Sequence, residues 1–153
     1  MEPTVTVQTS SVSETEAFGA KLARRMLEDP SLPPFVALFG DLGVGKTAFV
    51  RGFASALSPT SAVRSPTFAL VREYPARPRP IFHFDMYRVT DEDELISIGY
   101  YDYLARDGIC LVEWSENIAD DLPRDYLRIL IEKDNADAPD SRRITVSRMG
   151  GDA

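Results

Sequence analysis

Residues 40–47 read Gly40-Asp41-Leu42-Gly43-Val44-Gly45-Lys46-Thr47 and match the phosphate-binding pattern G-x-x-x-x-G-K-[ST] at every fixed position. The apolar run Phe35–Phe39 before them has the length and composition of a buried strand. After them, apolar residues recur at helical spacing from Phe49 to Leu57. A strand, a glycine-rich loop and a helix in this order predict a nucleoside triphosphate site, because backbone N–H groups and a helix N-terminus then point at one anion.

The composition is that of an ordinary globular protein. The 153 residues fit a single domain over residues 1–153, with 44% hydrophobic and 27% charged residues. The formal net charge of −7 argues against binding nucleic acid through the overall field of the molecule. The single cysteine, Cys110, lies in an apolar run, which argues against a disulfide framework or a cysteine metal cluster. With neither a signal peptide nor an apolar run of about 20 residues, we expect a cytoplasmic protein and no membrane association.

Strands and helices alternate along the rest of the chain. We expect strands at 4–7, 68–71, 81–85, 109–114, 126–132 and 144–147, and helices that begin at the capping box Ser13-x-x-Glu16 and at Asp91, the latter broken near Gly99. The polar stretch 134–141 is expected to be a flexible connection. A hairpin within residues 68–85 would make the sheet mixed. The predicted fold is a three-layer, P-loop NTPase-like α/β fold with a mixed, mainly parallel sheet flanked by helices.

Two of the predicted strands end in a carboxylate. Asp85 closes the strand that starts at Ile81, and Glu113 comes directly after Ile109–Val112. Ligands of α/β proteins bind at the carboxyl ends of the strands, where Lys46 can reach β- and γ-phosphates and Thr47 can offer a hydroxyl to Mg²⁺. One carboxylate is therefore expected to hold Mg²⁺ and the other to orient an attacking water, with the two roles unassigned. The alternative is that either carboxylate only caps a following turn.

Four further residues have two interpretations each. Thr67, in Ser65-Pro66-Thr67, is either part of a switch-like loop that senses the γ-phosphate or metal, or part of a turn. His83 shares a strand face with Asp85, which permits a site role, although the pattern favours a hydrogen-bonded core histidine. Trp114 is either core or a stacking platform, and Arg88 either meets phosphate or forms a surface salt bridge. The pairs Arg24-Arg25 and Arg142-Arg143 are predicted to be solvated, with contact to a partner or a nucleotide as the alternative for either.

The chain resembles the bacterial TsaE proteins, the P-loop ATPases needed for making threonylcarbamoyladenosine in tRNA. The resemblance covers nearly the whole chain. It rests on residues 40–47, Ser65-Pro66-Thr67-Phe68, His83-Phe84-Asp85-Met86-Tyr87-Arg88, Glu94-Leu95, Ile98-Gly99, Asp102-Tyr103-Leu104 and Glu113-Trp114-Ser115-Glu116. The phosphate loop alone is widespread, whereas this ordered set of motifs is specific.

The resemblance implies ATP and Mg²⁺ as ligands and assigns roles to the motif residues. It places Thr47 and Glu113 on Mg²⁺ and Lys46 on the phosphates, and makes Asp85 the carboxylate needed for turnover, with Asp85 also a metal candidate. It implies that Trp114 is functionally required and favours functional roles for His83 and Thr67. It further implies two partners, TsaB and TsaD, which carry out the threonylcarbamoyl transfer while the ATPase resets or regulates their complex. Contact with tRNA is then expected to be indirect.

Two other functions compete with an ATPase that serves tRNA modification. A small-molecule or nucleoside kinase would use Asp85-x-x-Arg88 to bind its acceptor, although no arginine-rich lid is evident in the sequence. A GTP-driven switch would need the guanine-reading motif Asn-Lys-x-Asp, and Glu132-Lys133-Asp134-Asn135 has the wrong order to supply it. The sequence therefore favours ATP over GTP.

Overall fold

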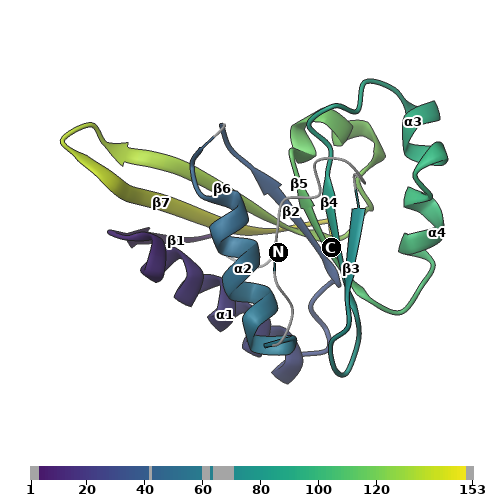
Figure 1. Cartoon of the computed structure of the whole chain (residues 1–153), viewed down its shortest axis with the longest axis horizontal. Helices are drawn as coiled ribbons and strands as arrows, with labels where there is room; N and C mark the ends of the chain where they lie inside the picture. The colour runs from purple at the N-terminus through teal and green to yellow at the C-terminus, as the bar shows by residue number, and fades with distance from the viewer. Residues whose placement is uncertain (1–3, 42, 60–62, 64–70, 151–153) are drawn as a thin grey trace.

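A seven-stranded sheet organises the part of the chain that the computed structural model describes, residues 4–41, 43–59, 63 and 71–150. Its strands are β1 (Val5–Thr9), β2 (Phe35–Phe39), β3 (Val71–Tyr74), β4 (Ile81–Asp85), β5 (Ile109–Glu113), β6 (Tyr126–Asn135) and β7 (Ala138–Met149). Their order is β1-β7-β6-β2-β5-β4-β3. Neighbours from β6 to β4 pair in parallel, whereas β7 and β3 pair antiparallel with their neighbours. The predicted α/β fold with a mixed, mainly parallel sheet is confirmed (Figure 1).

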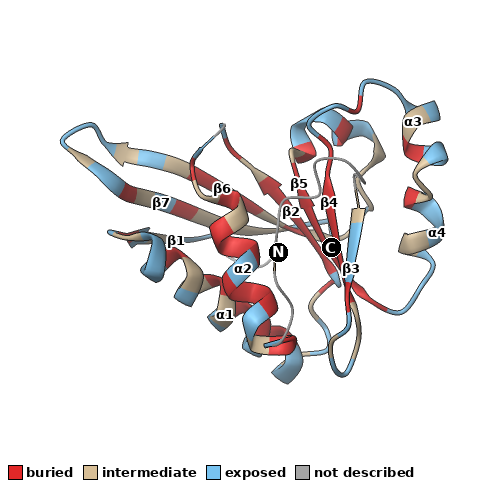
Figure 2. Cartoon of the chain, viewed as in Figure 1, coloured by how far each residue is buried: buried red, intermediate tan, exposed pale blue. Residues whose placement is uncertain are grey.

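Helices cover both faces of this sheet (Figure 1). They are α1 (Val12–Glu28), α2 (Lys46–Leu57), α3 (Glu92–Ser97), α4 (Tyr100–Leu104) and the 3₁₀ segment η1 (Ser115–Asp121). One hydrophobic cluster joins α1 and α2 to one face, and a second joins Leu95 of α3, Tyr100 of α4 and Ile118 of η1 to the other. The buried residues therefore form two layers of core, one on each side of the central strands (Figure 2).

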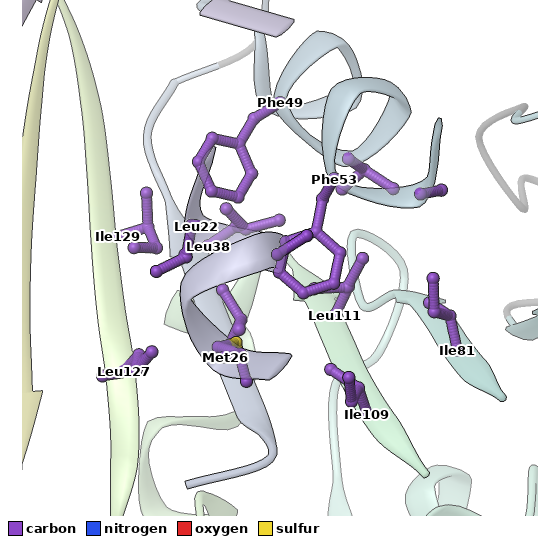
Figure 3. Packing of buried hydrophobic residues seen from close by; sticks show 14 of the residues in the cluster. Leu22, Met26, Leu38, Phe49, Phe53, Ile81, Ile109, Leu111, Leu127 and Ile129 are labelled. Carbon is purple, nitrogen blue, oxygen red and sulfur yellow. The ribbon is translucent and has the colours of Figure 1, made fainter. Parts of the chain in front are cut away.

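The core between α1, α2 and the sheet positions the phosphate loop. Phe49 and Phe53 of α2 are fully buried against strand residues that include Leu38 and Leu111 (Figure 3). Full burial of one such side chain stabilises the fold by about 1.5–3 kcal/mol. The two helices also touch closely, since a Cβ added at Gly52 would lie 1.8 Å from the Glu16 carbonyl oxygen. This packing fixes α2, and with it the start of the helix at the loop.

The first helix begins two residues earlier than the predicted capping box. The Oγ atom of Ser11 accepts from the N–H of Glu14 at 3.1 Å, and Glu14 Oε1 accepts from the N–H of Ser10 at 2.8 Å. The sequence holds two overlapping Ser-x-x-Glu patterns, and Ser11 has the extended backbone of an N-cap. Because β1 ends at Thr9, the chain turns at once and uses the earlier pattern, so the prediction of Ser13 and Glu16 was wrong.

The predicted flexible connection over residues 134–141 was also wrong, because β6 and β7 continue through most of it. Lys133 pairs with Arg142 across the ladder, and the Arg143 guanidinium lies 3.3 Å from Glu132 and 3.6 Å from Asp134. Most of the side chains at this end of the hairpin are exposed or half-buried (Figure 2). The sequence there therefore lacks the alternation of apolar and polar residues that indicates a strand.

Other predicted elements agree with the structure where it describes them. The hairpin within 68–85 is confirmed by the antiparallel pairing of β3 with β4, although the predicted strand residues 68–70 lie outside the described residues. The helical segment from Asp91 breaks at Gly99, where φ is 79°. No helix within the described ranges is long and apolar enough to cross a membrane.

Candidate functional site

The loop of residues 40–47 joins the carboxyl end of β2 to the first turn of α2. Its glycines have positive φ angles of 142° at Gly40, 80° at Gly43 and 107° at Gly45, a region that other residues rarely adopt. Gly45 is the N-cap of α2, and no side chain within the described ranges caps the N–H groups of this helix. Because a helix N-terminus attracts negative charge, the loop has the backbone geometry of an anion site.

Two side chains from distant parts of the sequence hold the loop. Glu116, in η1, accepts a hydrogen bond from the N–H of Gly40 at 2.8 Å. Arg142, on β7, donates from Nε to the carbonyl oxygen of Val44 at 2.7 Å. The beginning and the middle of the loop are therefore each fixed by a charged side chain. Asp41 is exposed at the surface of the loop, and Leu42 lies outside the described residues.

The side chain of Lys46 is buried and bends back over the loop. Its Nζ donates to the Gly40 carbonyl oxygen at 2.5 Å and lies 3.4 Å from the centre of the Trp114 ring. Burial lowers the pKa of Lys46, and the negative charges of Glu116, Glu113, Asp85 and Asp41 oppose that shift in decreasing order. The ammonium group is thus surrounded by carboxylates and one aromatic face, at the point where the loop meets α2.

Thr47 and Glu113 are in direct contact. The Thr47 hydroxyl donates to Glu113 Oε1 at 3.0 Å, and Glu113 is 4% exposed, so that a carboxylate at the end of β5 meets the first turn of α2. Asp85 lies directly across the parallel β4–β5 ladder from Glu113. Its Oδ1 accepts from the N–H of Tyr87 at 2.9 Å, so the turn-capping alternative applies to Asp85 in addition to its place beside the loop.

The single histidine lies behind this carboxylate. His83 is fully buried on β4, and its Nε2 is 2.5 Å from Glu113 Oε2. Its other ring nitrogen, Nδ1, is 3.0 Å from the hydroxyl oxygen of Tyr74 on β3. This burial rules out direct contact between His83 and a partner molecule, and it agrees with both the core and the site interpretations of the sequence.

Trp114 follows β5 with a positive φ of 59°, which is unusual for a bulky residue. Its ring is half-buried and contacts both the Lys46 ammonium and the ring of Tyr87, whose centroid is 4.9 Å away at an interplanar angle of 54°. Tyr87 itself is 55% exposed, and Arg88 is exposed beside it. The Trp114 ring therefore links the buried ammonium of Lys46 to an exposed aromatic side chain.

The structure therefore brings together the predicted residues Lys46, Thr47, Asp85, Glu113 and Trp114, with His83 one contact further in. Thr67 lies outside the described residues. Among the residues that the structure describes, no group of three or more His, Cys, Asp and Glu side chains is arranged to hold a metal ion by itself.

Comparison with known proteins identifies the family. Residues 9–144 match the family model described as threonylcarbamoyl adenosine biosynthesis protein TsaE. The chain belongs to the TsaE family. The tRNA threonylcarbamoyladenosine biosynthesis protein TsaE of Bacillus subtilis is 42% identical over 115 residues, covering 75% of this chain and 70% of that protein. The TsaE protein of Treponema pallidum is 34% identical over 137 residues, covering 90% of this chain and 96% of its own.

A solved structure has the same fold. The crystal structure of Bacillus subtilis YdiB matches with a TM-score of 0.74 and 32% identity, over 99% of this chain and 88% of that one. The mixed sheet described above is therefore also the fold of that protein. The resemblance to TsaE expected from the sequence motifs is confirmed by the family match.

Sequence reasoning missed three residues that shape the site of this TsaE chain. Glu116 belongs to a motif that the sequence singled out, yet its bond to Gly40 was not predicted. Arg142 was predicted to be solvated, and this was wrong, because it is half-buried and bound to the loop. Tyr74 was given no role by the sequence, yet it ends β3 and its hydroxyl lies at His83. These three residues reach the site only when the whole chain has folded. Spacing along one segment therefore does not predict their contacts.

Proposed function

We propose that the chain binds ATP with Mg²⁺ at residues 40–47, hydrolyses it, and thereby serves threonylcarbamoyladenosine synthesis in tRNA through a partner transferase complex. The observation that carries this proposal is the 3.0 Å hydrogen bond from the Thr47 hydroxyl to Glu113 at the first turn of α2. P-loop NTPases hold Mg²⁺ with the loop Ser or Thr and a carboxylate at a strand end, and here the two groups already meet. Membership of the TsaE family supports the link to tRNA modification.

Each residue of the site has its own role in the proposed hydrolysis. The backbone N–H groups of the loop bind phosphate oxygens, and Lys46 exchanges its bond to the Gly40 carbonyl for the β- and γ-phosphates. Thr47 and Glu113 hold Mg²⁺, which supplies charge neutralisation across the two phosphates. Asp85, next to Glu113 on the neighbouring strand, accepts a hydrogen bond from the attacking water or completes the metal site.

The proposed partners are TsaB and TsaD, which carry out the threonylcarbamoyl transfer. The net charge of −7 does not suit binding of tRNA by the overall field, so tRNA contact is assigned to the complex. The exposed ring of Tyr87 contacts Trp114, which in turn contacts Lys46, and offers a surface through which a partner would sense the nucleotide site.

Two substitutions test this function. Lys46→Ala removes the positive charge that binds the phosphates. It is expected to weaken ATP binding about 10- to 100-fold, which corresponds to the roughly 1.5–3 kcal/mol of a hydrogen bond to a charged group. Asp85→Ala is expected to stop ATP turnover while sparing most of the binding. Calorimetric titration with ATP and phosphate release assays measure the two effects. Lys133→Ala, which removes an exposed lysine on the β6–β7 hairpin, is the matched control.

The decisive assay reconstitutes tRNA modification from purified components, with and without this chain. Modification that proceeds equally well with Lys46→Ala would reject the site. Stoichiometric phosphorylation of a nucleoside or metabolite by the isolated chain would instead support the kinase alternative. Tighter binding of GTP than of ATP in the same titrations would favour the GTP switch.

A further inference from the structure

Four side chains form one continuous line of hydrogen bonds that ends at the loop. The Tyr74 hydroxyl contacts His83 Nδ1 at 3.0 Å, His83 Nε2 contacts Glu113 Oε2 at 2.5 Å, and Glu113 Oε1 accepts from Thr47 at 3.0 Å. The line crosses β3, β4 and β5 and finishes on α2. Tyr74, His83 and Glu113 are 5%, 0% and 4% exposed, so water does not compete effectively for these bonds.

The strand register explains why these residues meet. His83 lies opposite Leu111 on β5 and opposite Arg72 on β3, so Glu113 and Tyr74 are each two residues further along the neighbouring strands. Residues two apart share a face of the sheet, and diagonal neighbours are within reach of long side chains. The face that they share is the one covered by α1 and α2, and Thr47 lies in the first turn of α2.

The direction of each hydrogen bond follows from the chemistry of the groups. An ionised carboxylate only accepts, so the nitrogen that faces Glu113, Nε2, must carry a proton. In a neutral imidazole the other nitrogen, Nδ1, is then an acceptor, and the Tyr74 hydroxyl must donate to it. The Tyr74 hydroxyl therefore satisfies the buried Nδ1 acceptor of the tautomer in which Nε2–H points at the carboxylate.

We infer that Tyr74 is a positioning residue of the nucleotide site, acting through His83 on Glu113. By holding the His83 ring in the orientation that points Nε2–H at the carboxylate, it anchors Oε2 of Glu113 and leaves Oε1 facing Thr47 and the metal position. The metal role of Glu113 in this inference rests on the proposed function, whereas the tautomer of His83 does not. A buried tyrosine that only packs is the alternative, because the Tyr74 and His83 rings are also in contact, with centroids 5.8 Å apart.

The single histidine of the chain makes the first test direct. With ¹⁵N-labelled histidine, no affinity tag and a solution at about pH 8, the imidazole nitrogens of His83 give one set of resonances. The inference expects the Nε2–H tautomer in the unmodified protein. In Tyr74→Phe the carboxylate of Glu113 keeps the proton on Nε2, and the Nδ1 resonance is expected to shift because this nitrogen loses its hydrogen-bond donor. An Nδ1–H tautomer or a doubly protonated ring in the unmodified protein overturns the inference without any variant, as does an Nδ1 resonance that is unchanged in Tyr74→Phe.

A matched control separates this effect from simple loss of a buried hydroxyl. Tyr100 is fully buried on the opposite face of the sheet, where its hydroxyl donates to the Asp121 carbonyl at 2.8 Å. Tyr100→Phe removes a comparable hydrogen bond far from His83 and is expected to leave the histidine resonances and the Mg²⁺ requirement unchanged. If both variants shift the histidine spectrum alike, Tyr74 has only a structural role.

The second test measures the metal requirement. Tyr74→Phe is expected to raise the Mg²⁺ concentration for half-maximal ATP turnover about tenfold, which is typical when a residue that orients a metal ligand is replaced. Binding of ATP without Mg²⁺ is expected to stay unchanged. In a His83→Gln background the same substitution is expected to cause no further increase in this Mg²⁺ concentration, because Tyr74 acts on Glu113 only through His83. Equal loss of ATP binding with and without Mg²⁺ would overturn the inference. If the unmodified protein shows no Mg²⁺-dependent nucleotide binding, the proposed function fails, and the histidine spectrum still decides whether the Tyr74 hydroxyl donates to His83.

Discussion

Gly40 is the loop residue for which a side chain is most completely excluded. Its φ of 142° is rare for residues with a Cβ, and a Cβ there would lie 2.4 Å from the carbonyl oxygen of Ile131 on β6 and 2.9 Å from Cγ2 of Val44. The Ile131 atom belongs to the backbone of a paired strand, which cannot move away without breaking the ladder. The first glycine of the pattern is therefore required by packing as well as by backbone conformation.

Gly40→Ala is accordingly expected to lower the free energy of unfolding by about 2–4 kcal/mol, as strain and a steric clash combine. Gly43→Ala is the comparison, because Gly43 also has a positive φ of 80°, whereas, its chain neighbours aside, no heavy atom of the described residues lies within 4 Å of its Cβ position. Its cost is expected to be about 1–2 kcal/mol, from conformation alone. Urea denaturation measures the loss of unfolding free energy in each variant. Equal losses would show that the backbone near Ile131 moves to accept the new methyl group without cost.

At the scale of elements, the β6–β7 hairpin supports the loop from outside the motif. Arg142 on β7 reaches inward to the Val44 carbonyl, while its neighbour Arg143 points away and forms exposed ion pairs with Glu132 and Asp134. Exposed ion pairs of this kind contribute at most about 1 kcal/mol each. The two adjacent arginines thus have different roles, one at the loop and one at the surface.

Arg142→Ala is expected to weaken ATP binding about tenfold, because it removes a charge-assisted hydrogen bond that orders the loop. Arg143→Ala, on the same strand and with the same loss of charge, is expected to leave ATP affinity within about twofold of the unmodified protein. Calorimetric titration of both variants provides the comparison. Equal affinities for the two would show that the contact with Val44 does not order the loop for binding.

The sequence predicts elements best where their apolar pattern is strong and local. β2 and β4 were predicted with their observed bounds, because each is a short apolar run that is buried over all or nearly all of its length. The ends of β6 and β7 were missed, since their stability comes from pairing with each other outside the core. The bonds of Arg142 and Tyr74 to the site were missed for a related reason: cross-strand register decides them, and no spacing along one segment encodes that register.

At the scale of the whole molecule, the site depends on the complete sheet. The loop follows β2, its carboxylates end β4 and β5, and its two supporting side chains come from η1 and β7. These segments are separated by up to about a hundred residues of sequence, so only the folded chain brings them together. A ligand that needs all of them binds the folded state alone and stabilises it in proportion to its concentration.

Cys110 allows the stabilisation of the folded sheet by bound nucleotide to be measured. It lies on β5 between Phe35 of β2 and Phe82 of β4. It is 3% exposed, and burial raises the pKa of its thiol to about 12, so a thiol reagent can reach it only when the sheet opens. Saturating ATP with Mg²⁺, at about 100 times its Kd, is expected to slow labelling about a hundredfold when reclosing outpaces the reagent. Lys46→Ala should lose this protection. Rapid labelling of the folded protein, unaffected by nucleotide, would show that β5 opens independently of the site.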